Sequence, residues 1–505
     1  MDTEKTFAAI DRSIKKTNAK LKKEEVSVVR SISAGAAIVS GLEKVEMEEL
    51  LEFPNGVFGM VQTLNRDSVG VVFLDSSRSI KAGDRVQRTG RVLDVPVSEN
   101  LLGRVINPLG TALDGKAPIA FSERRKVEVE AVPIMDRAPV DTPLQTGIKA
   151  VDSFTPIGRG QRELILGDRQ TGKTAIALDT MINQKNSGVI NIYCAIGQRN
   201  SAVSGVIADL EKYDVLQNTI VVVASANDEA GMQYVAPYAA TSIGEYFMEK
   251  GRDVLIVYDD LTNHARAYRQ MSLLLRRPPG REAFPGDIFY IHSRLLERST
   301  HLREELGGGS LTSLPIVATE AGNISAYIPT NIISITDGQI YLSAPMFQKG
   351  IMPAIDTGKS VSRVGGDAQL PAYKSLIGPL KLFYAQFEEL ESFTKFGTQL
   401  DKETQKRIAR GQAIRFVLEQ RQYHPLPAAD QIAVFMSANA GLFDGLNNEK
   451  NNKAQQIVLD VFHTQFADLQ AEINARKKLT EEEIAELINA IKQGLIREEL
   501  YSDAD

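Results

Sequence analysis

An eight-residue segment, Gly167–Thr174, constrains the fold of this chain more than any other part of the sequence. An apolar, strand-like run precedes it at Glu163–Leu166, and helix-forming residues follow it at Ala175–Gln184. In that context the glycines let backbone N–H groups converge on phosphate oxygens, and the helix adds its positive N-terminal end. The segment predicts a phosphate-binding loop in a parallel α/β sheet. Its expected nucleotide contacts are Gly167, Asp168, Arg169, Gln170, Thr171, Gly172, Lys173 and Thr174.

Two side chains in this loop and one strand further along the chain predict a magnesium nucleotide. Lys173 is expected to reach the β- and γ-phosphates, and the hydroxyl of Thr174 is expected to bind Mg²⁺. The apolar run Asp253–Tyr258 ends in two carboxylates, which is typical of the strand whose aspartate holds Mg²⁺. Asp259 is the preferred metal residue because it comes first after the apolar run, and Asp260 is the alternative.

The strand-like run that follows the predicted helix ends in an amide side chain. The strand-like run Val189–Ile196 is followed by Gly197 and Gln198. An amide can donate a hydrogen bond to water but cannot take its proton. Gln198 therefore argues against hydrolysis at this site, although glutamine does position water in some GTPases.

Composition excludes several classes of protein. The 505 residues include 58 Lys and Arg against 64 Asp and Glu, a net charge of −6 that argues against a nucleic-acid-binding surface. The single cysteine, Cys194, lies in an apolar run and predicts a buried thiol rather than a disulfide framework or a reactive group. One Cys and five His also argue against a zinc site, and no stretch has the length and apolarity of a membrane span.

Changes in sequence pattern predict a multidomain chain. Residues 1–24 form a charged helical arm, which is either solvated or docks a partner through a narrow apolar stripe. Residues 25–92 carry short apolar runs separated by turn residues and predict a β-barrel. Residues 93–370 alternate strands and helices, and predict the α/β nucleotide-binding domain. Residues 371–505 predict a domain of helices over 372–397, 402–419, 430–440, 453–475 and 481–499.

One further loop combines small residues with a single arginine. Pro353–Gly366 contains Ser360, Ser362 and Arg363 among Gly, Val and Ala residues. Such a loop suits an arginine finger, whose guanidinium stabilises charge on the phosphates bound by a neighbouring subunit. The pattern alone favours an ordinary surface arginine.

Together these motifs resemble the α subunit of F-type ATP synthases over nearly the whole chain. The most specific stretches are Gly167–Thr174, Ala195–Arg199, Tyr268–Arg298 and Pro353–Ser362. The resemblance implies a β-barrel crown, a RecA-like nucleotide domain and a C-terminal helical domain. The stretch Gly366–Lys374 is more similar to a divergent set of bacterial and archaeal synthases.

The resemblance also implies a function and partners. The chain would alternate with the catalytic β subunit in an α₃β₃ ring around a γ shaft, with its N-terminal arm on the peripheral stalk. It would bind Mg-ATP without turnover, in a complex that makes ATP from ADP and phosphate using a proton or sodium gradient. That complex would lie on the cytoplasmic face of a bacterial inner membrane, with membrane association only through the complex.

Several residues take roles from this resemblance. Arg363 matches the finger that reaches the catalytic site of β, and Ser360 matches a position needed for activity. Gln198 stands where catalytic subunits carry a glutamate. The adenine pocket maps onto Phe347, Gln420 and Gln422.

One departure and two alternatives accompany the resemblance. Met352 stands where the family usually has arginine, so the nucleotide affinity of the pocket is open. A self-sufficient ring ATPase is one alternative, against which Gln198 counts. A structural subunit that has lost nucleotide binding is the other, against which the intact loop counts.

Overall fold

The computed structural model describes residues 25–121, 123–394 and 401–501. The chain divides into two compact units, 1–92 and 93–505, which are treated separately below. The predicted N-terminal arm lies outside the described residues. Within the described ranges, no helix combines the length and apolarity needed to cross a bilayer.

The first unit is a β-barrel, as the sequence predicted, and it is closed by six strands. Alternating valines point inward, and Val39, Val61, Val71 and Val86 are fully buried. Two of its strands, β3 and β6, have only short apolar runs because charged residues interrupt them. The strand order is β1 (Val26–Ser33), β2 (Ala36–Ser40), β5 (Ser68–Phe73), β4 (Val57–Leu64), β3 (Glu49–Phe53) and β6 (Arg85–Val92).

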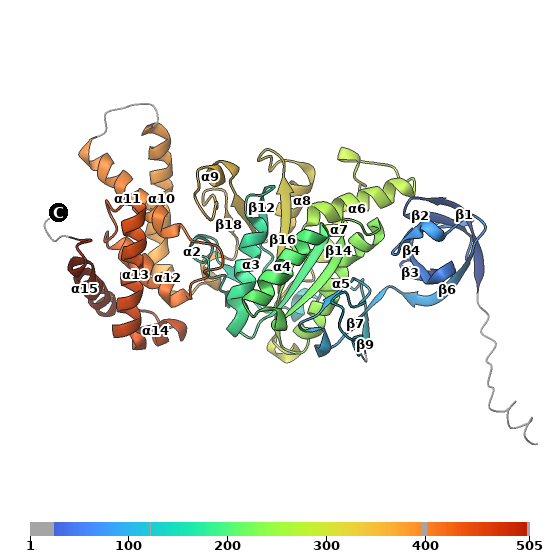
Figure 1. Ribbon diagram of the computed structural model, residues 1–505, viewed down its shortest axis with the longest axis horizontal. Helices are drawn as coiled ribbons and strands as arrows, with labels where there is room; N and C mark the ends of the chain where they lie inside the picture. The colour runs from blue at the N-terminus through green and yellow to red at the C-terminus, as the bar shows by residue number, and fades with distance from the viewer. Residues whose placement is uncertain (1–24, 122, 395–400, 502–505) are drawn as a thin grey trace, which may run out of the picture. The chain divides into compact units, whose positions relative to one another are not determined.

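The second unit is built on an eight-stranded sheet (Figure 1). Its strand pairs are parallel, except that the edge strand β18 runs antiparallel to β17. The predicted strands match β12 to β15 within about two residues at each end. The order is β18 (Val361–Ser362), β17 (Gly338–Leu342), β12 (Leu164–Asp168), β16 (Ser310–Thr319), β15 (Asp253–Asp259), β13 (Ile190–Gln198), β14 (Thr219–Ser225) and β8 (Val105–Ile106).

Helices and small ribbons surround this sheet. The nearly continuous apolar strands are covered by helices, as buried parallel strands require. Cys194 in β13 is fully buried, and burial raises the pKa of its thiol well above the usual value. The helices are α2 (Lys149–Phe154), α3 (Lys173–Asn183), α4 (Asn200–Lys212), α5 (Ala230–Met248), α6 (Leu261–Leu274), α7 (Ile288–Leu296), α8 (Tyr327–Ile335) and α9 (Ala344–Gln348); the ribbons pair β7 (Asp94–Val97) with β9 (Glu123–Lys126) and β10 (Pro143–Leu144) with β11 (Ile157–Gly158).

The C-terminal part is helical, as predicted, with one correction. The helix expected over 453–475 is two helices, because Phe466 leaves the helical conformation with φ −127° and ψ 38°. A capping box opens the last helix, since Thr480 and Glu483 each bond the backbone of the other. The helices are α10 (Pro371–Thr394), α11 (Lys402–Leu418), α12 (Ala428–Asn439), α13 (Asn448–Gln465), α14 (Ala467–Asn474) and α15 (Glu481–Arg497).

A buried polar cluster joins these helices to the sheet region. The carboxylate of Asp152 accepts hydrogen bonds from the backbone N–H groups of Thr146 (2.8 Å) and Gly147 (2.9 Å). It also accepts one from Nε2 of Gln431 on α12, at 2.8 Å. Because a buried carboxylate left without donors is costly, this cluster holds α12 against α2. It thereby fixes the wall of the site described next.

Candidate functional site

The segment Gly167–Thr174 forms a tight loop between β12 and α3. Gly172 occupies the left-handed region at φ 98°, which glycine adopts without strain, directly before the first residue of α3. The hydroxyl of Thr171 donates to the carbonyl of Asp168 at 2.8 Å. The carboxylate of Asp168 accepts from the N–H of Gly322 at 2.8 Å. The side chains of Asp168 and Thr171 thus brace the loop, leaving its backbone N–H groups for a phosphate.

The charged residues of the loop differ in their surroundings. Lys173 is buried, and its ammonium donates to the carbonyl of Asp168. Burial lowers the pKa of Lys173, while the nearby carboxyls of Asp260 and Asp259 oppose the shift. Arg169 and Gln170 are exposed at the tip. A buried ammonium at a helix N-terminus is suited to phosphate oxygens.

Asp259, at the end of β15, is the centre of a hydrogen-bonded cluster. Its carboxylate accepts from the hydroxyl of Thr174, the hydroxyl of Tyr193 and Nε2 of Gln198, each at 2.8 Å. Burial raises the pKa of Asp259, and these donors oppose that shift. Asp260 instead caps α6 by accepting from the N–H of Asn263 at 2.7 Å. Of the two carboxylates, Asp259 is therefore the one that faces the phosphate-binding loop.

The oxygens at this point suit a magnesium ion bound with a nucleotide. Thr174 and Asp259 bring a hydroxyl and a carboxylate together at the start of α3, and Mg²⁺ prefers such oxygen ligands together with phosphate oxygens and water. No cluster of three or more His, Cys, Asp or Glu residues able to hold a metal occurs in the described ranges. The residues present therefore fit a Mg²⁺ ion that is bound to nucleotide phosphates and takes only some of its ligands from the protein.

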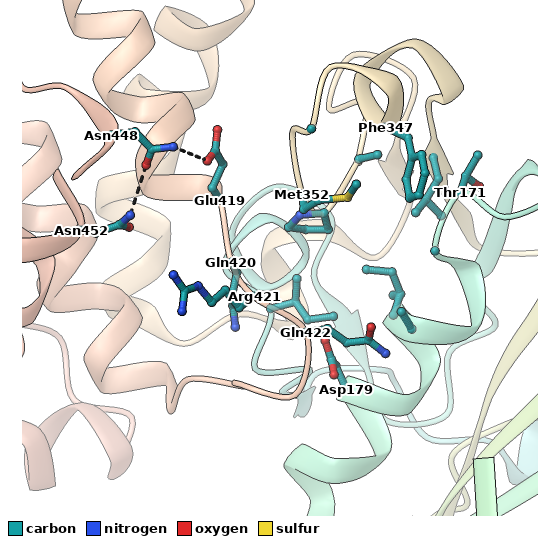
Figure 2. Close-up of a pocket in the computed structure, with 18 residues that line it drawn as sticks. Thr171, Asp179, Phe347, Met352, Glu419, Gln420, Arg421, Gln422, Asn448 and Asn452 are labelled. Carbon is teal, nitrogen blue, oxygen red and sulfur yellow. Dashed lines mark hydrogen bonds between the residues drawn. The ribbon is translucent and has the colours of Figure 1, made fainter. Parts of the chain in front are cut away.

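A cavity of about 600 Å³ opens beside the loop, between α3, the α9 region and the C-terminal helices. Its size suits a nucleoside. Figure 2 shows Phe347 near Thr171 of the loop, and Gln422 beside Asp179 of α3. Phe347 and Met352 are each 37% exposed, so both offer apolar surface to a planar base. The lining is Ile148, Thr171, Gly172, Ala175, Ile176, Asp179, Leu342, Phe347, Gly350, Met352, Pro353, Ala354, Glu419, Gln420, Arg421, Gln422, Asn448 and Asn452.

The two predicted base-contacting glutamines lie in this lining but differ in their bonding. The side-chain oxygen of Gln420 accepts from the N–H of Lys149 at 2.9 Å. Its amide nitrogen donates to the carbonyls of Gly147 and His424, each at 2.7 Å. Gln420 therefore holds the chain segment in place, while Gln422 is exposed at the cavity.

Sequence analysis missed three polar groups of this region. Tyr193 lies in an apolar strand and donates to Asp259. The one signal in the sequence was that a buried tyrosine hydroxyl usually needs a hydrogen-bond partner. Asp179 lines the cavity and accepts from the N–H of Tyr423 at 2.9 Å; burial raises its pKa to about 6. Glu419 accepts from the side chain of Asn448 at 3.2 Å, and burial raises its pKa as well. Both carboxyls come from helical patterns that carry no signal of a pocket.

The structure places Ser360 and Arg363 away from this cavity, on the edge of the sheet. Ser360 is buried, where its hydroxyl donates to the carbonyl of Asp356 at 2.6 Å and accepts from the N–H of Tyr341 at 3.0 Å. Arg363 is exposed, and its guanidinium lies 3.5 Å from the carbonyl of Ile333. Ser360 thus fixes the strand, and Arg363 presents a cation at the surface.

Family models match three consecutive parts of the chain. The ATP synthase alpha/beta family, beta-barrel domain, matches residues 27–90. The nucleotide-binding domain of that family matches residues 147–362. The ATP synthase alpha/beta chain, C terminal domain, matches residues 369–494.

The chain is also similar along its length to named proteins. It is 55% identical over 503 residues to "ATP synthase subunit alpha 2" of Syntrophus aciditrophicus, covering 99% of this chain and 97% of that one. It is 56% identical over 492 residues to "ATP synthase subunit alpha 2" of Polaromonas naphthalenivorans, covering 97% and 95%. It is 54% identical over 499 residues to "ATP synthase subunit alpha 1" of a Marinomonas species, covering 99% and 98%.

Proposed function

The chain belongs to the ATP synthase alpha/beta family, among subunits named alpha, and from that membership we propose that it is the regulatory, non-catalytic nucleotide-binding subunit of an F-type ATP synthase. In this role it binds Mg-ATP in the cavity beside the loop and does not hydrolyse it. Its own contribution to catalysis is a cation supplied to a neighbouring subunit.

The observation that carries the proposal is the position of Gln198. Its amide donates to Asp259 at 2.8 Å, at the end of the strand where hydrolysis would need a proton acceptor. An amide has no basic atom to take a proton from water. The site therefore has the parts for binding a nucleotide and lacks this part of the machinery for cleaving it.

The same site suits a nucleotide that stays bound. The backbone of Gly167–Gly172 and the ammonium of Lys173 would hold the phosphates, and the base would enter the cavity beside Phe347 and Gln422. Thr174 and Asp259 would hold Mg²⁺, which when bound neutralises phosphate charge.

Arg363 is the proposed arginine finger. It is exposed directly after the short edge strand β18, before which the buried hydroxyl of Ser360 fixes the backbone. A permanent cation at the surface can reach phosphates bound by an adjacent subunit and stabilise the charge that develops during transfer. Ser360 then acts by positioning, because its hydroxyl is engaged by backbone groups.

The proposed partners follow from the names of the relatives. The catalytic β subunit would alternate with this chain in an α₃β₃ ring around γ, and the arm of residues 1–24 would contact the peripheral stalk. The complex would make ATP using a proton or sodium gradient, on the cytoplasmic face of a bacterial inner membrane. This chain would contact the membrane only through its partners.

The test measures binding and turnover by the purified chain alone. Calorimetry should detect Mg-ATP binding, while a phosphate-release assay should detect negligible hydrolysis. Steady turnover at about 1 s⁻¹ or faster, an ordinary enzyme rate, would overturn the non-catalytic assignment. Absence of nucleotide binding would favour a purely structural subunit instead.

A further inference from the structure

Three residues form a row across the edge of the sheet in the second unit. Leu164 of β12 pairs with Gln339 of β17, so Glu163 lies opposite Gly338. Gly338 in turn pairs with Ser362 of β18, the residue before Arg363. Paired residues on neighbouring strands direct their side chains to one face. The side chains of Glu163 and Ser362 therefore share a face, with a glycine between them.

The glycine lets the Glu163 carboxyl lie across the neighbouring strand. A Cβ atom at Gly338 would lie 2.5 Å from Oε2 and 2.9 Å from Oε1 of Glu163. It would also lie only 2.2 Å from the carbonyl oxygen of Val361. Any side chain at Gly338 would thus displace either the carboxyl or β18. The carboxyl occupies the space directly beside the strand that leads to Arg363.

Hydrogen bonds connect this carboxyl to the same strand. Nε2 of Gln161 lies 2.7 Å from Oε2 of Glu163 and 3.3 Å from the hydroxyl of Ser362, and donates to both. The Ser362 hydroxyl donates to the carbonyl of Pro156 at 2.7 Å and accepts from the N–H of Gly365 at 3.1 Å. Ser362, directly before Arg363, and Gly365, two residues after it, are therefore held by a cluster that includes Glu163.

The Glu163 carboxyl is fully buried, and its Oε1 atom has no hydrogen-bond partner among the residues that the structure describes. Of the charged groups around it, Asp337 disfavours ionisation and Arg363 favours it. Asp337 is paired with Arg162 at 2.8 Å, and Arg162 also pairs with Glu297 at 2.5 Å. Arg363 is thus the nearby cation that an ionised Glu163 would attract most directly.

We propose that Glu163, buried beneath the edge strand, is a positioning residue for Arg363. The inference rests on the proposed role of Arg363 as a finger. In its protonated form the acid supports β18 and leaves the guanidinium directed outward. In its ionised form it draws the guanidinium toward the sheet and away from the neighbouring nucleotide.

The electrostatics agree with this geometry. Burial, with the nearby Asp337, raises the pKa of Glu163 well above its usual value, while Gln161 and Arg363 oppose the shift. The acid therefore stays neutral to a higher pH than an ordinary glutamate does, and ionises only as the pH rises further. Removing its ability to ionise should therefore change turnover most at high pH.

The test compares ATPase pH profiles of rings reconstituted from this chain, β and γ. Glu163→Gln keeps the shape and the neutral charge, so kcat should stay within about twofold of wild type at the low end of the pH profile, where Glu163 is protonated. As the pH is raised and Glu163 ionises, the ratio of the Gln variant's kcat to that of wild type should rise. Glu163→Asp, one methylene shorter, should lose about tenfold in kcat with the KM for ATP unchanged, since misplacement slows chemistry more than binding.

Two controls separate this inference from the proposed function. Glu297→Gln removes a carboxylate from the neighbouring ion pairs, and the ratio of its kcat to that of wild type should not change with pH. Arg363→Ala should abolish most turnover, and Glu163→Asp should then add no further loss. If Arg363→Ala has no effect, the finger itself is wrong. A third result is that Arg363→Ala impairs turnover, the kcat ratio of Glu163→Gln to wild type does not change with pH, and Glu163→Asp has the wild-type kcat. The positioning role of Glu163 is then wrong, while Arg363 keeps its role as the finger. If rings that carry Glu163→Asp do not assemble, the ATPase pH profile of Glu163→Gln by itself decides whether Glu163 positions Arg363.

Discussion

Replacing Gln420 by alanine should destabilise the second unit as well as weaken nucleotide binding. The side chain makes three hydrogen bonds, to the backbone of Lys149, Gly147 and His424. At about 1 kcal/mol each, their loss costs about 3 kcal/mol. Unfolding entropy of about 2.1 cal/mol/K per residue, over a unit of roughly 400 residues, converts this to a fall in Tm of about 3–4 °C.

The matched control is Gln422→Ala, on the same segment. Gln422 is exposed at the cavity, so its loss should reduce Mg-ATP affinity and leave the Tm within about 1 °C of wild type. Differential scanning calorimetry and titration calorimetry on the purified chain measure both quantities. If Gln420→Ala cuts affinity with an unchanged Tm, its amide contacts the base directly, and the reasoning from its backbone bonds is refuted.

Three further predictions concern single side chains of the site. Lys173→Ala should weaken Mg-ATP binding to the isolated chain by about 100-fold, because a charge-assisted contact to phosphate is lost; unchanged affinity by calorimetry would contradict it. Met352→Arg should tighten binding about two- to tenfold by adding a donor and a cation beside Phe347, whereas Met352→Leu should not. Burial lowers the pKa of Lys149 to about 7; above that pH the folded chain releases the proton while the unfolded chain keeps it, so stability rises with pH. Lys149→Met should therefore raise the Tm at pH 6, with the gain shrinking toward pH 9.5; a gain independent of pH would refute this.

Much of the fold could be predicted because local signals agreed with the global structure. The phosphate-binding loop lies between a strand and a helix as expected, and the capping box at Thr480 opens α15. Strands β3 and β6 are harder to detect because charged residues interrupt their short apolar runs. The break at Phe466 also escaped, since the apolar spacing continues through it and the backbone alone departs from the helix.

The candidate site was predictable where backbone chemistry sets the residue type, and less so where long-range packing does. Lys173 could be located from the glycine-rich loop that precedes α3, and Asp259 from the apolar strand that it ends. The choice between Asp259 and Asp260 needed the observation that Asp260 caps α6. The bonding of Gln420 could not be predicted from its neighbours in the sequence, because its partners Lys149 and Gly147 are 271 and 273 positions away in the chain. Glu163 needed the strand order, because β12, β17 and β18 are neighbours only in the folded sheet.

The most direct measurement of the central claim is single-turnover ATP hydrolysis by the reconstituted ring, with Lys173→Ala or Arg363→Ala in this chain alone. The account predicts that the Lys173 variant still cleaves bound ATP, because the pocket of this chain is not the catalytic one. It predicts that the Arg363 variant assembles normally and loses about 10³-fold in rate, as removal of an arginine finger does. The opposite pattern, with cleavage lost in the Lys173 variant and retained in the Arg363 variant, would contradict the account.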